Sequence, residues 1–151
     1  MVVLQFAFSE GLKNPQRPGG SQTRRVIYTG THDNDTTVGW YAKLDEPARN
    51  DVRTYIGSDG SDIAWDLIRV ALASVADTAI VPLQDVLSLE SEARMNTPGE
   101  GMGNWSWRYH PDQLQPRLAE HFKEMVVRYN RTAEPVVPDK LPPNYLPITA
   151  R

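Results

Sequence analysis

The sequence contains no cysteine and only three histidines among its 151 residues. Without cysteine there can be no disulfide bond, no thiol nucleophile and no thiolate-bound metal. The absence of cysteine also fits a reducing compartment, and we therefore expect a cytoplasmic protein.

The sequence also has no excess of basic residues and no long hydrophobic run. Lys and Arg number 16 against 19 Asp and Glu, which gives a net charge of -3 and no basic stripe for nucleic acid. The longest apolar region, residues 70–83, is interrupted by polar side chains and is too short to cross a bilayer. The apolar residues 1–8 lack a basic leader and a cleavage site, so they predict a strand and not a secretory signal. Neither a nucleic-acid partner nor a membrane anchor is expected.

The elements that are present alternate between strands and helices. The pattern predicts strands within residues 1–8, 26–31 and 78–83, with a Pro- and Gly-rich loop over 9–25. Residues 37–56 have helical character, and Asp45-Glu46-Pro47 suits the first turn of a second helix. This alternation is typical of parallel strands joined by helical crossovers, that is, of an α/β fold.

Two further helices follow from apolar periodicity. A helix that Ser61 can cap has a continuous apolar stripe, made of Ile63, Leu67, Ile68, Ala71, Leu72 and Val75. A last helix over about residues 111–132 has an apolar face made of Leu114, Leu118, Phe122, Met125, Val126 and Tyr129. Five prolines over residues 134–147 then predict an extended tail.

The strongest functional signal is the run Val26 to Thr31, which is rich in β-branched residues and stops at His32-Asp33-Asn34-Asp35. Asn and Asp favour turns and caps, so the strand is expected to end at about Thr31. Ligands and chemistry gather at the carboxyl ends of strands in barrels and parallel sheets. A His next to an Asp at this position therefore indicates a candidate site.

The same residues resemble a known motif. Residues 28–36, Tyr-Thr-Gly-Thr-His-Asp-Asn-Asp-Thr, are similar to the seventh-strand motif of the amylomaltases, the 4-α-glucanotransferases of the α-amylase clan. Residues 3–8 resemble that family's sixth strand and residues 81–87 its eighth. Residues 91–99 and 103–108 resemble the loop that follows the eighth strand. The resemblance extends from about Met1 to Arg108.

The resemblance implies a fold. Residues 1–132 would form the carboxy-terminal part of a (β/α)8 TIM barrel, about strands 6 to 8 and their helices, and residues 133–151 a Pro-rich tail. Three strands are too few to close a parallel barrel, which needs eight strands and roughly 250 residues. We therefore expect this chain to be a piece of a longer catalytic barrel.

The resemblance also implies a mechanism. Amylomaltases are retaining enzymes with an Asp nucleophile after the fourth strand, a Glu acid/base after the fifth, and a third Asp after the seventh. Only the third is represented here, as Asp33, which would stabilise the transition state while the neighbouring His32 binds sugar. Three further positions correspond to family positions beside the sugar cleft, namely Asn96, Phe6 and Glu10. The family often has an Asp at the position of Glu10, whose side chain is longer. No cofactor is implied.

Other interpretations of these residues stay open. Residues 32–35 could form an Asx-rich turn that caps the next helix, with Asp35 in a capping or loop-orienting role. A metal site at His32, Asp33 and Asp35 is a weaker alternative, because no other histidine has a matching ligand spacing. Asn96 could simply form a turn.

The residues in and before the loop after the third strand also allow more than one interpretation. Trp105 and Trp107 would face one side of an extended segment, as core or, less favoured, as a sugar platform. Gln84, Asp85 and Arg94 are expected in a polar network that closes the barrel, without a catalytic role.

Three functional hypotheses follow. The leading one is a part of a 4-α-glucanotransferase that moves α-1,4-glucan segments to glucose or another glucan. This chain lacks the expected nucleophile and acid/base and should be inactive alone. The second is a non-catalytic remnant or split-gene subunit that acts by association with the missing amino-terminal barrel portion. The third and weakest is a metal-dependent hydrolase that uses His32 and Asp33.

Overall fold

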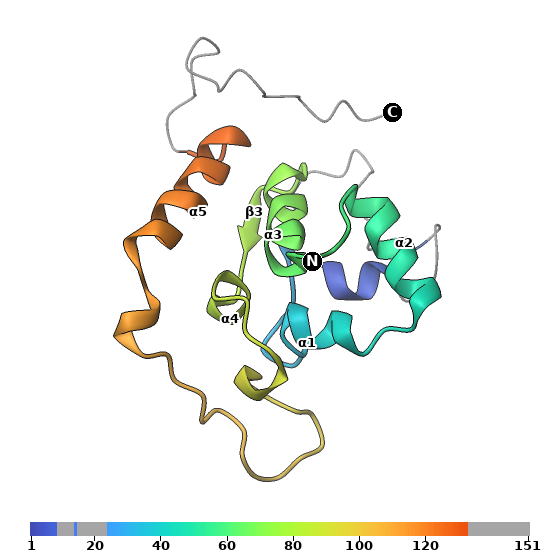
Figure 1. The fold of residues 1–151 in the computed structure, drawn as a ribbon, viewed down its shortest axis with the longest axis vertical. Coiled ribbons are helices and arrows are strands. Elements are labelled where there is room, and N and C mark those ends of the chain that lie inside the picture. The colour runs from blue at the N-terminus through green and yellow to red at the C-terminus, as the bar shows by residue number, and fades with distance from the viewer. Residues whose placement is uncertain (9–13, 15–23, 133–151) are drawn as a thin grey trace. The chain divides into compact units, whose positions relative to one another are not determined.

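The structure is a computed structural model that describes residues 1–8, 14 and 24–132 (Figure 1). The chain forms two compact units, Met1–Tyr109 and His110–Arg151. Within the described residues, no helix combines the length and the apolar character that a membrane span requires. The predicted tail, residues 133–151, lies outside the described residues.

The first unit is built on three short parallel strands, as the alternation of elements predicts. The strands are β1 (Val2–Val3), β2 (Val26–Tyr28) and β3 (Thr78–Ile80), and they lie side by side in chain order. Ile27 in the central strand is aligned with Val2 on one side and with Ala79 on the other. All three strands therefore end at the same edge of the sheet.

The first strand is shorter than expected. A strand within residues 1–8 was the prediction, but β1 ends at Val3 and a 3-10 helix, η1 (Leu4–Phe8), follows. Leu4, Ala7 and Phe8 are buried at the i, i+3 and i+4 spacing of a helical turn. The backbone N–H of Gln5 still donates to the carbonyl of Thr29, so the 3-10 helix stays attached to the segment after β2.

The helices after β2 follow the predicted boundaries. They are α1 (Thr37–Ala42) and α2 (Glu46–Ile56). Asp45 caps α2 by accepting from the backbone N–H of Ala48 at 2.9 Å. Gly57 ends α2 at φ 69°, a left-handed conformation that glycine adopts without a Cβ penalty.

The helix α3 (Ile63–Ala73) supplies much of the core and lies alongside β3 in Figure 1. Five of the six residues of the predicted stripe are buried, whereas Val75 is 58% exposed because α3 ends two residues before it. Ser61 does not cap α3, since the cap position is Asp62. Ile63, Leu67 and Ala71 of this stripe share one core cluster with residues from the first strand, the 3-10 helix, β2 and α2, among them Val2, Leu4, Phe8, Ile27, Val52 and Ile56.

The third strand is also shorter and less buried than predicted. Strand β3 covers residues 78–80 and not 78–83, and Thr78 and Ile80 are exposed. Pro82 has no backbone N–H to donate to a strand partner, and the short helix α4 (Leu83–Val86) starts directly after it. A further 3-10 helix, η3 (Ser91–Ala93), leads into the loop that contains Asn96.

The second unit contains the 3-10 helix η4 (Pro111–Gln113) and the helix α5 (Pro116–Arg128). The prediction of a single helix over about residues 111–132 was therefore wrong at its start, and α5 also ends earlier, at Arg128. The residue before a proline avoids the helical region, and Gln115, before Pro116, has φ -72° and ψ 144°. Helix α5 has the predicted apolar face: Met125 is buried, and Leu118, Phe122 and Val126 are partly buried. Leu114, which was predicted on the same face, lies before α5 and is 45% exposed.

Candidate functional site

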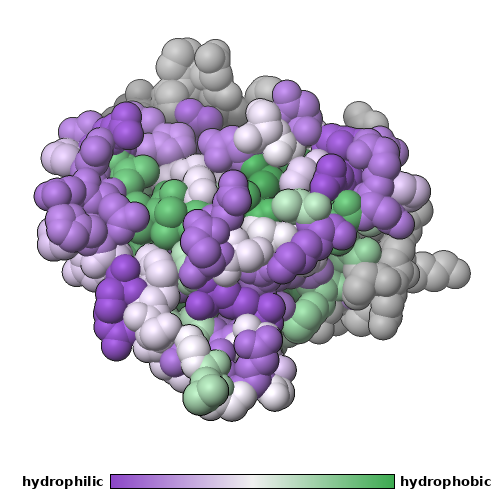
Figure 2. All heavy atoms as spheres, turned by 60° about the horizontal axis from the view of Figure 1, so that its bottom comes forward, coloured by the Kyte–Doolittle hydropathy of each residue, from purple (hydrophilic) through white to green (hydrophobic). Residues whose placement is uncertain are grey.

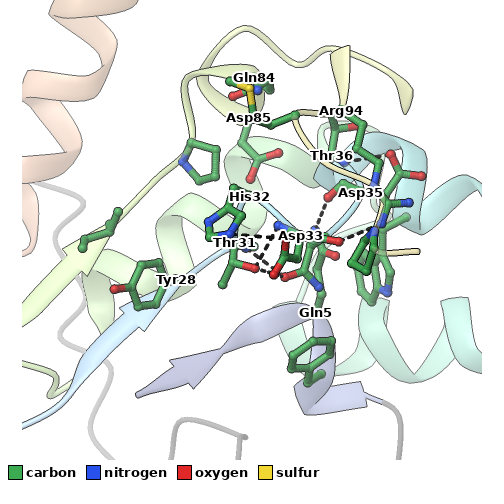
Figure 3. Close-up of a pocket in the computed structure, with 18 of the residues that line it drawn as sticks. Gln5, Tyr28, Thr31, His32, Asp33, Asp35, Thr36, Gln84, Asp85 and Arg94 are labelled. Carbon is green, nitrogen blue, oxygen red and sulfur yellow. Dashed lines mark hydrogen bonds and ion pairs between the residues drawn. The ribbon is translucent and has the colours of Figure 1, made fainter. Parts of the chain in front are cut away.

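A pocket of about 1080 Å³ lies at the carboxyl ends of the three strands (Figure 3). Hydrophilic side chains predominate on the face of the molecule in Figure 2, with hydrophobic ones in separate patches. Most of the lining comes from the segments that follow each strand, and it includes Gln5, Phe6, His32, Asp33, Arg94 and Trp105. The predicted position of the site, at strand ends, agrees with this geometry.

The loop after β2 is shaped by Asn34. Its Oδ1 accepts from the backbone N–H of Thr31 at 2.9 Å and from the Thr31 hydroxyl at 2.7 Å. The backbone N–H of Asn34 also donates to the carbonyl of Thr31 at 3.1 Å, so Asn34 closes a turn over residues 31–34. The alternative of a helix cap within residues 32–35 was wrong, because the N-cap of α1 is Thr36. His32 and Asp33, whose side chains are 57% and 50% exposed, extend from the turn to the pocket.

The Asp33 carboxylate is contacted from two loops. Asn96 Nδ2 donates to its Oδ1 at 2.6 Å, and His32 Nε2 lies 3.3 Å from the same oxygen. Among the described residues, none donates to Oδ2. The structure thus brings together three of the residues named from the sequence, although Asn96 is 63 positions away from Asp33.

Arg94 links these two loops through their backbones. Its Nη2 donates to the carbonyl of Asp33 at 2.7 Å, and its Nε donates to the carbonyl of Asn96 at 2.8 Å. The planar guanidinium can hold two acceptors at a fixed angle, which a lysine ammonium cannot. The sequence placed Arg94 in a polar network without a catalytic role, and its place two residues before Asn96 was the one signal for this link.

Asp35 ties its loop to the end of α1 and to η3. Its Oδ2 accepts from Lys43 Nζ at 2.5 Å and from Ser91 Oγ at 2.8 Å, while the neighbouring Thr36 hydroxyl caps α1. Burial raises the pKa of the Asp35 carboxyl, but hydrogen bonds and the Lys43 charge outweigh burial and hold the pKa below its ordinary value. The loop-orienting role expected for Asp35 agrees with these contacts.

This ion pair predicts an acid-dependent part of the stability. A carboxyl whose folded pKa is lowered stabilises the fold above its unfolded pKa of about 3.9, and this stability is lost as pH falls through the folded pKa. Replacement of Lys43 by Met should therefore lower the free energy of unfolding at pH 7. The deficit should shrink as pH falls through the lowered pKa of Asp35. Urea denaturation between pH 3 and 7 checks this, and a pH-independent deficit would contradict it.

Asp85 forms the buried polar network expected near the end of β3. Its Oδ1 accepts from the backbone N–H of Thr37 at 2.8 Å, and its Oδ2 accepts from the hydroxyls of Thr37 and Thr29. Burial raises the pKa of this carboxyl, and the three hydrogen bonds only partly oppose the shift. The network fixes the start of α1 to α4 and to the segment directly after β2, and Asp85 itself lines the pocket.

The remaining predicted residues have mixed outcomes. Phe6 lines the pocket and is 49% exposed, whereas Glu10 lies outside the described residues. Trp105 was expected in the core, but this residue is 54% exposed and lines the pocket. The segment is not extended at Trp105, where φ is 61°, so the expected alternation with Trp107 does not apply. Among the described residues, no three His, Asp or Glu side chains form a group that could hold a metal ion.

Comparison with known proteins identifies the family. The family model described as 4-alpha-glucanotransferase matches residues 1–115. The chain belongs to the 4-alpha-glucanotransferase family. A 4-alpha-glucanotransferase of Synechocystis sp. is 50% identical over 133 residues, which are 87% of this chain and 26% of that protein. The Thermus thermophilus 4-alpha-glucanotransferase is 43% identical over 133 residues, covering 83% of this chain and 27% of the relative.

A solved structure gives the same assignment. The amylomaltase from Streptococcus agalactiae in complex with acarbose matches with a TM-score of 0.82 and 29% identity, over 86% of this chain and 27% of that chain. This chain therefore spans about a quarter of the length of the 4-alpha-glucanotransferases that it matches. The match supports the predicted α/β part of a larger barrel fold.

One relative bears on the expected compartment. The rice protein, 46% identical over 136 residues (87% of this chain, 23% of the relative), is described as chloroplastic/amyloplastic. The 4-alpha-glucanotransferase family is therefore not confined to the cytoplasm that the missing cysteines suggest.

Proposed function

We propose that this chain is the carboxy-terminal part of the catalytic (β/α)8 barrel of a 4-α-glucanotransferase, with β1, β2 and β3 as its sixth to eighth strands. Residues 1–132 would belong to the barrel and residues 133–151 to a tail. The complete enzyme would move α-1,4-glucan segments to glucose or another glucan. The observation that carries this proposal is the convergence of His32 and Asn96 on one oxygen of Asp33.

The proposed role of Asp33 is to stabilise the transition state. In a retaining mechanism the sugar passes through an oxocarbenium-like state, and a carboxylate that binds ring hydroxyls more tightly in that state raises the rate. His32 and Asn96 contact Oδ1, so Oδ2 is the oxygen that would accept from sugar hydroxyls. An amide and an imidazole can also bind hydroxyls themselves.

The rest of the chemistry would come from other parts of the enzyme. The nucleophilic Asp and the acid/base Glu are proposed to follow the fourth and fifth strands, which this chain does not represent. Phe6 and Glu10 are proposed as further sugar contacts, and the exposed ring of Phe6 in the pocket supports the first of these. The mechanism needs only carboxylates and calls for no cofactor.

A hybrid enzyme tests the proposal. This chain would replace the corresponding last quarter of the Synechocystis relative, to which it is 50% identical. The hybrid should release glucose from maltotriose, whereas the 151-residue chain alone should release none. A folded but inactive hybrid, or an active isolated chain, would contradict the proposal.

A second candidate is a subunit that acts by association. It is favoured by β3, an outer strand of the described sheet, where Ile80 is 43% exposed. Co-expression of this chain with the separate first three quarters of the Synechocystis relative would test association. Recovery of transfer from the two separate polypeptides would favour the split-subunit hypothesis over a single continuous chain.

Arg94 should affect the rate through the position of Asp33. In the hybrid, Arg94→Ala should lower kcat/KM on maltotriose on the order of 10- to 100-fold, because small displacements of a reacting group are costly. Arg94→Lys should recover only part of this, since its ammonium cannot reproduce both hydrogen bonds. Arg117→Ala, on the exposed side of α5, is the matched control. Equal rates for all three variants would show that Arg94 has no positioning role.

A further inference from the structure

We propose that Trp105 is a stacking platform for a glucose unit of an α-glucan in this pocket. The inference rests on the proposed glucan site and adds a residue that determines how the sugar ring lies there. Trp105 is 54% exposed, and it lines the pocket. By comparison, Trp65 is 9% exposed and contributes to the interior of the same unit.

The position of the indole suits a sugar that also reaches Asp33. The ring centroids of Trp105 and His32 are 5.1 Å apart with an angle of 39° between the ring planes. His32 Nε2 is in turn 3.3 Å from Asp33 Oδ1. A pyranose ring carries C–H groups on its faces and hydroxyls around its rim. One glucose unit can therefore place a face on the indole while a hydroxyl approaches the carboxylate.

The backbone of Trp105 is held in a conformation that bulky residues rarely adopt. Its φ of 61° lies in the left-handed region, where glycine or asparagine would be accommodated more easily. The Trp105 N–H donates to the carbonyl of Met95 at 2.7 Å, and Arg108 Nη1 donates to the carbonyl of Trp105 at 2.9 Å. A role of the exposed indole surface in sugar binding would account for this disfavoured backbone conformation.

The loop around Trp105 is organised before any ligand arrives. Asn104 Oδ1 accepts from the backbone N–H of Thr97 at 2.8 Å, and its Nδ2 donates to the carbonyl of Glu100 at 2.8 Å. These hydrogen bonds close the loop between Asn96 and Trp105. One hydrogen-bonded loop thus presents both the Asn96 amide, which contacts Asp33, and the Trp105 indole. Because the loop is ordered before the ligand binds, less conformational entropy is lost on binding.

The four tryptophan indole N–H groups of the chain give a direct test. The 151-residue protein, labelled with 15N and assigned by triple-resonance NMR, would be titrated with maltoheptaose. The Trp105 indole and the His32 amide should shift along one saturation curve, while the Trp65 indole stays in place. Cellohexaose, a β-1,4-linked glucan, is the control for linkage.

Variants measure the contribution of the indole. Trp105→Ala should raise the apparent Kd for maltoheptaose on the order of 3- to 10-fold, the range expected for the loss of an aromatic contact. Trp105→Phe should recover most of the affinity, because it restores an aromatic face. Trp107→Phe, two residues away and outside the pocket lining, should bind as the unaltered chain does.

Two results would overturn the inference, and they differ in what else they contradict. A shift of the His32 amide with a stationary Trp105 indole would mean that glucan binds without the platform, which leaves the proposed function intact. No shift at any position would contradict both the platform and glucan binding by this chain. The titration of the unaltered chain decides between these results even if a variant fails to fold.

Discussion

Asp33→Asn should lower the transfer rate of the hybrid enzyme on the order of 10³-fold or more while the protein folds normally. The amide has the size of the carboxylate, and its oxygen can still accept the hydrogen bond from Asn96. What the variant loses is the negative charge beside the proposed oxocarbenium-like state, so the loss should fall on kcat more than on KM. Initial rates of glucose release from maltotriose, with a thermal melt of each protein, measure both quantities.

Asp112→Asn provides the matched control for that experiment. Asp112 is a highly exposed carboxylate in the second unit. Its replacement by Asn removes a negative charge and should leave the transfer rate unchanged. If Asp33→Asn kept its rate within about tenfold of the unaltered hybrid, a tenfold change being only 1.4 kcal/mol, Asp33 would not be the transition-state stabiliser. A variant that loses both activity and its melting transition would point to folding, and Asp33→Glu, which keeps the charge, would then separate the two effects.

Asp85→Ala should reduce the free energy of unfolding of the chain by about 3 kcal/mol, because it removes three hydrogen bonds at one buried carboxylate. The backbone N–H of Thr37 would lose its partner at the start of α1, and burial without a partner is costly. Asp85→Asn should cost much less, since its oxygen can still accept from that N–H. Urea denaturation followed by tryptophan fluorescence gives these free energies, with the exposed Asp77→Ala as control.

The pH dependence of Asp85 has the opposite sign to that of Asp35. Because burial raises the folded pKa of Asp85, the folded state binds more protons than the unfolded state above about pH 3.9. The stability contributed by Asp85 is therefore present below that pH and declines as pH rises through the raised pKa. Asp85→Asn should remove this decline. A difference between the two proteins that does not change with pH would contradict the assignment of a raised pKa.

Local patterns predicted the regular elements well and their ends less well. The boundaries of α2 followed from Asp45 and Gly57, because caps and left-handed glycines act within one turn of helix. The segment Leu4–Phe8 was misassigned because a short apolar run fits a strand or a helical turn equally, and packing against the core decided between them. Pro82 and Pro116 were visible in the sequence, yet their effect on the neighbouring element was underestimated.

The sequence by itself determined the family motif at His32-Asp33, the alternation of strands and helices and the chemistry available at the strand ends. Only the tertiary structure decided that Asn96 and Arg94 meet Asp33, across separations of 63 and 61 positions. It also decided that Trp105 lies exposed beside His32 and not in the core. The physical reason is that turns, caps and periodicity depend on neighbours along the chain. Contacts between distant loops depend instead on the parallel sheet that brings the strand ends to one edge.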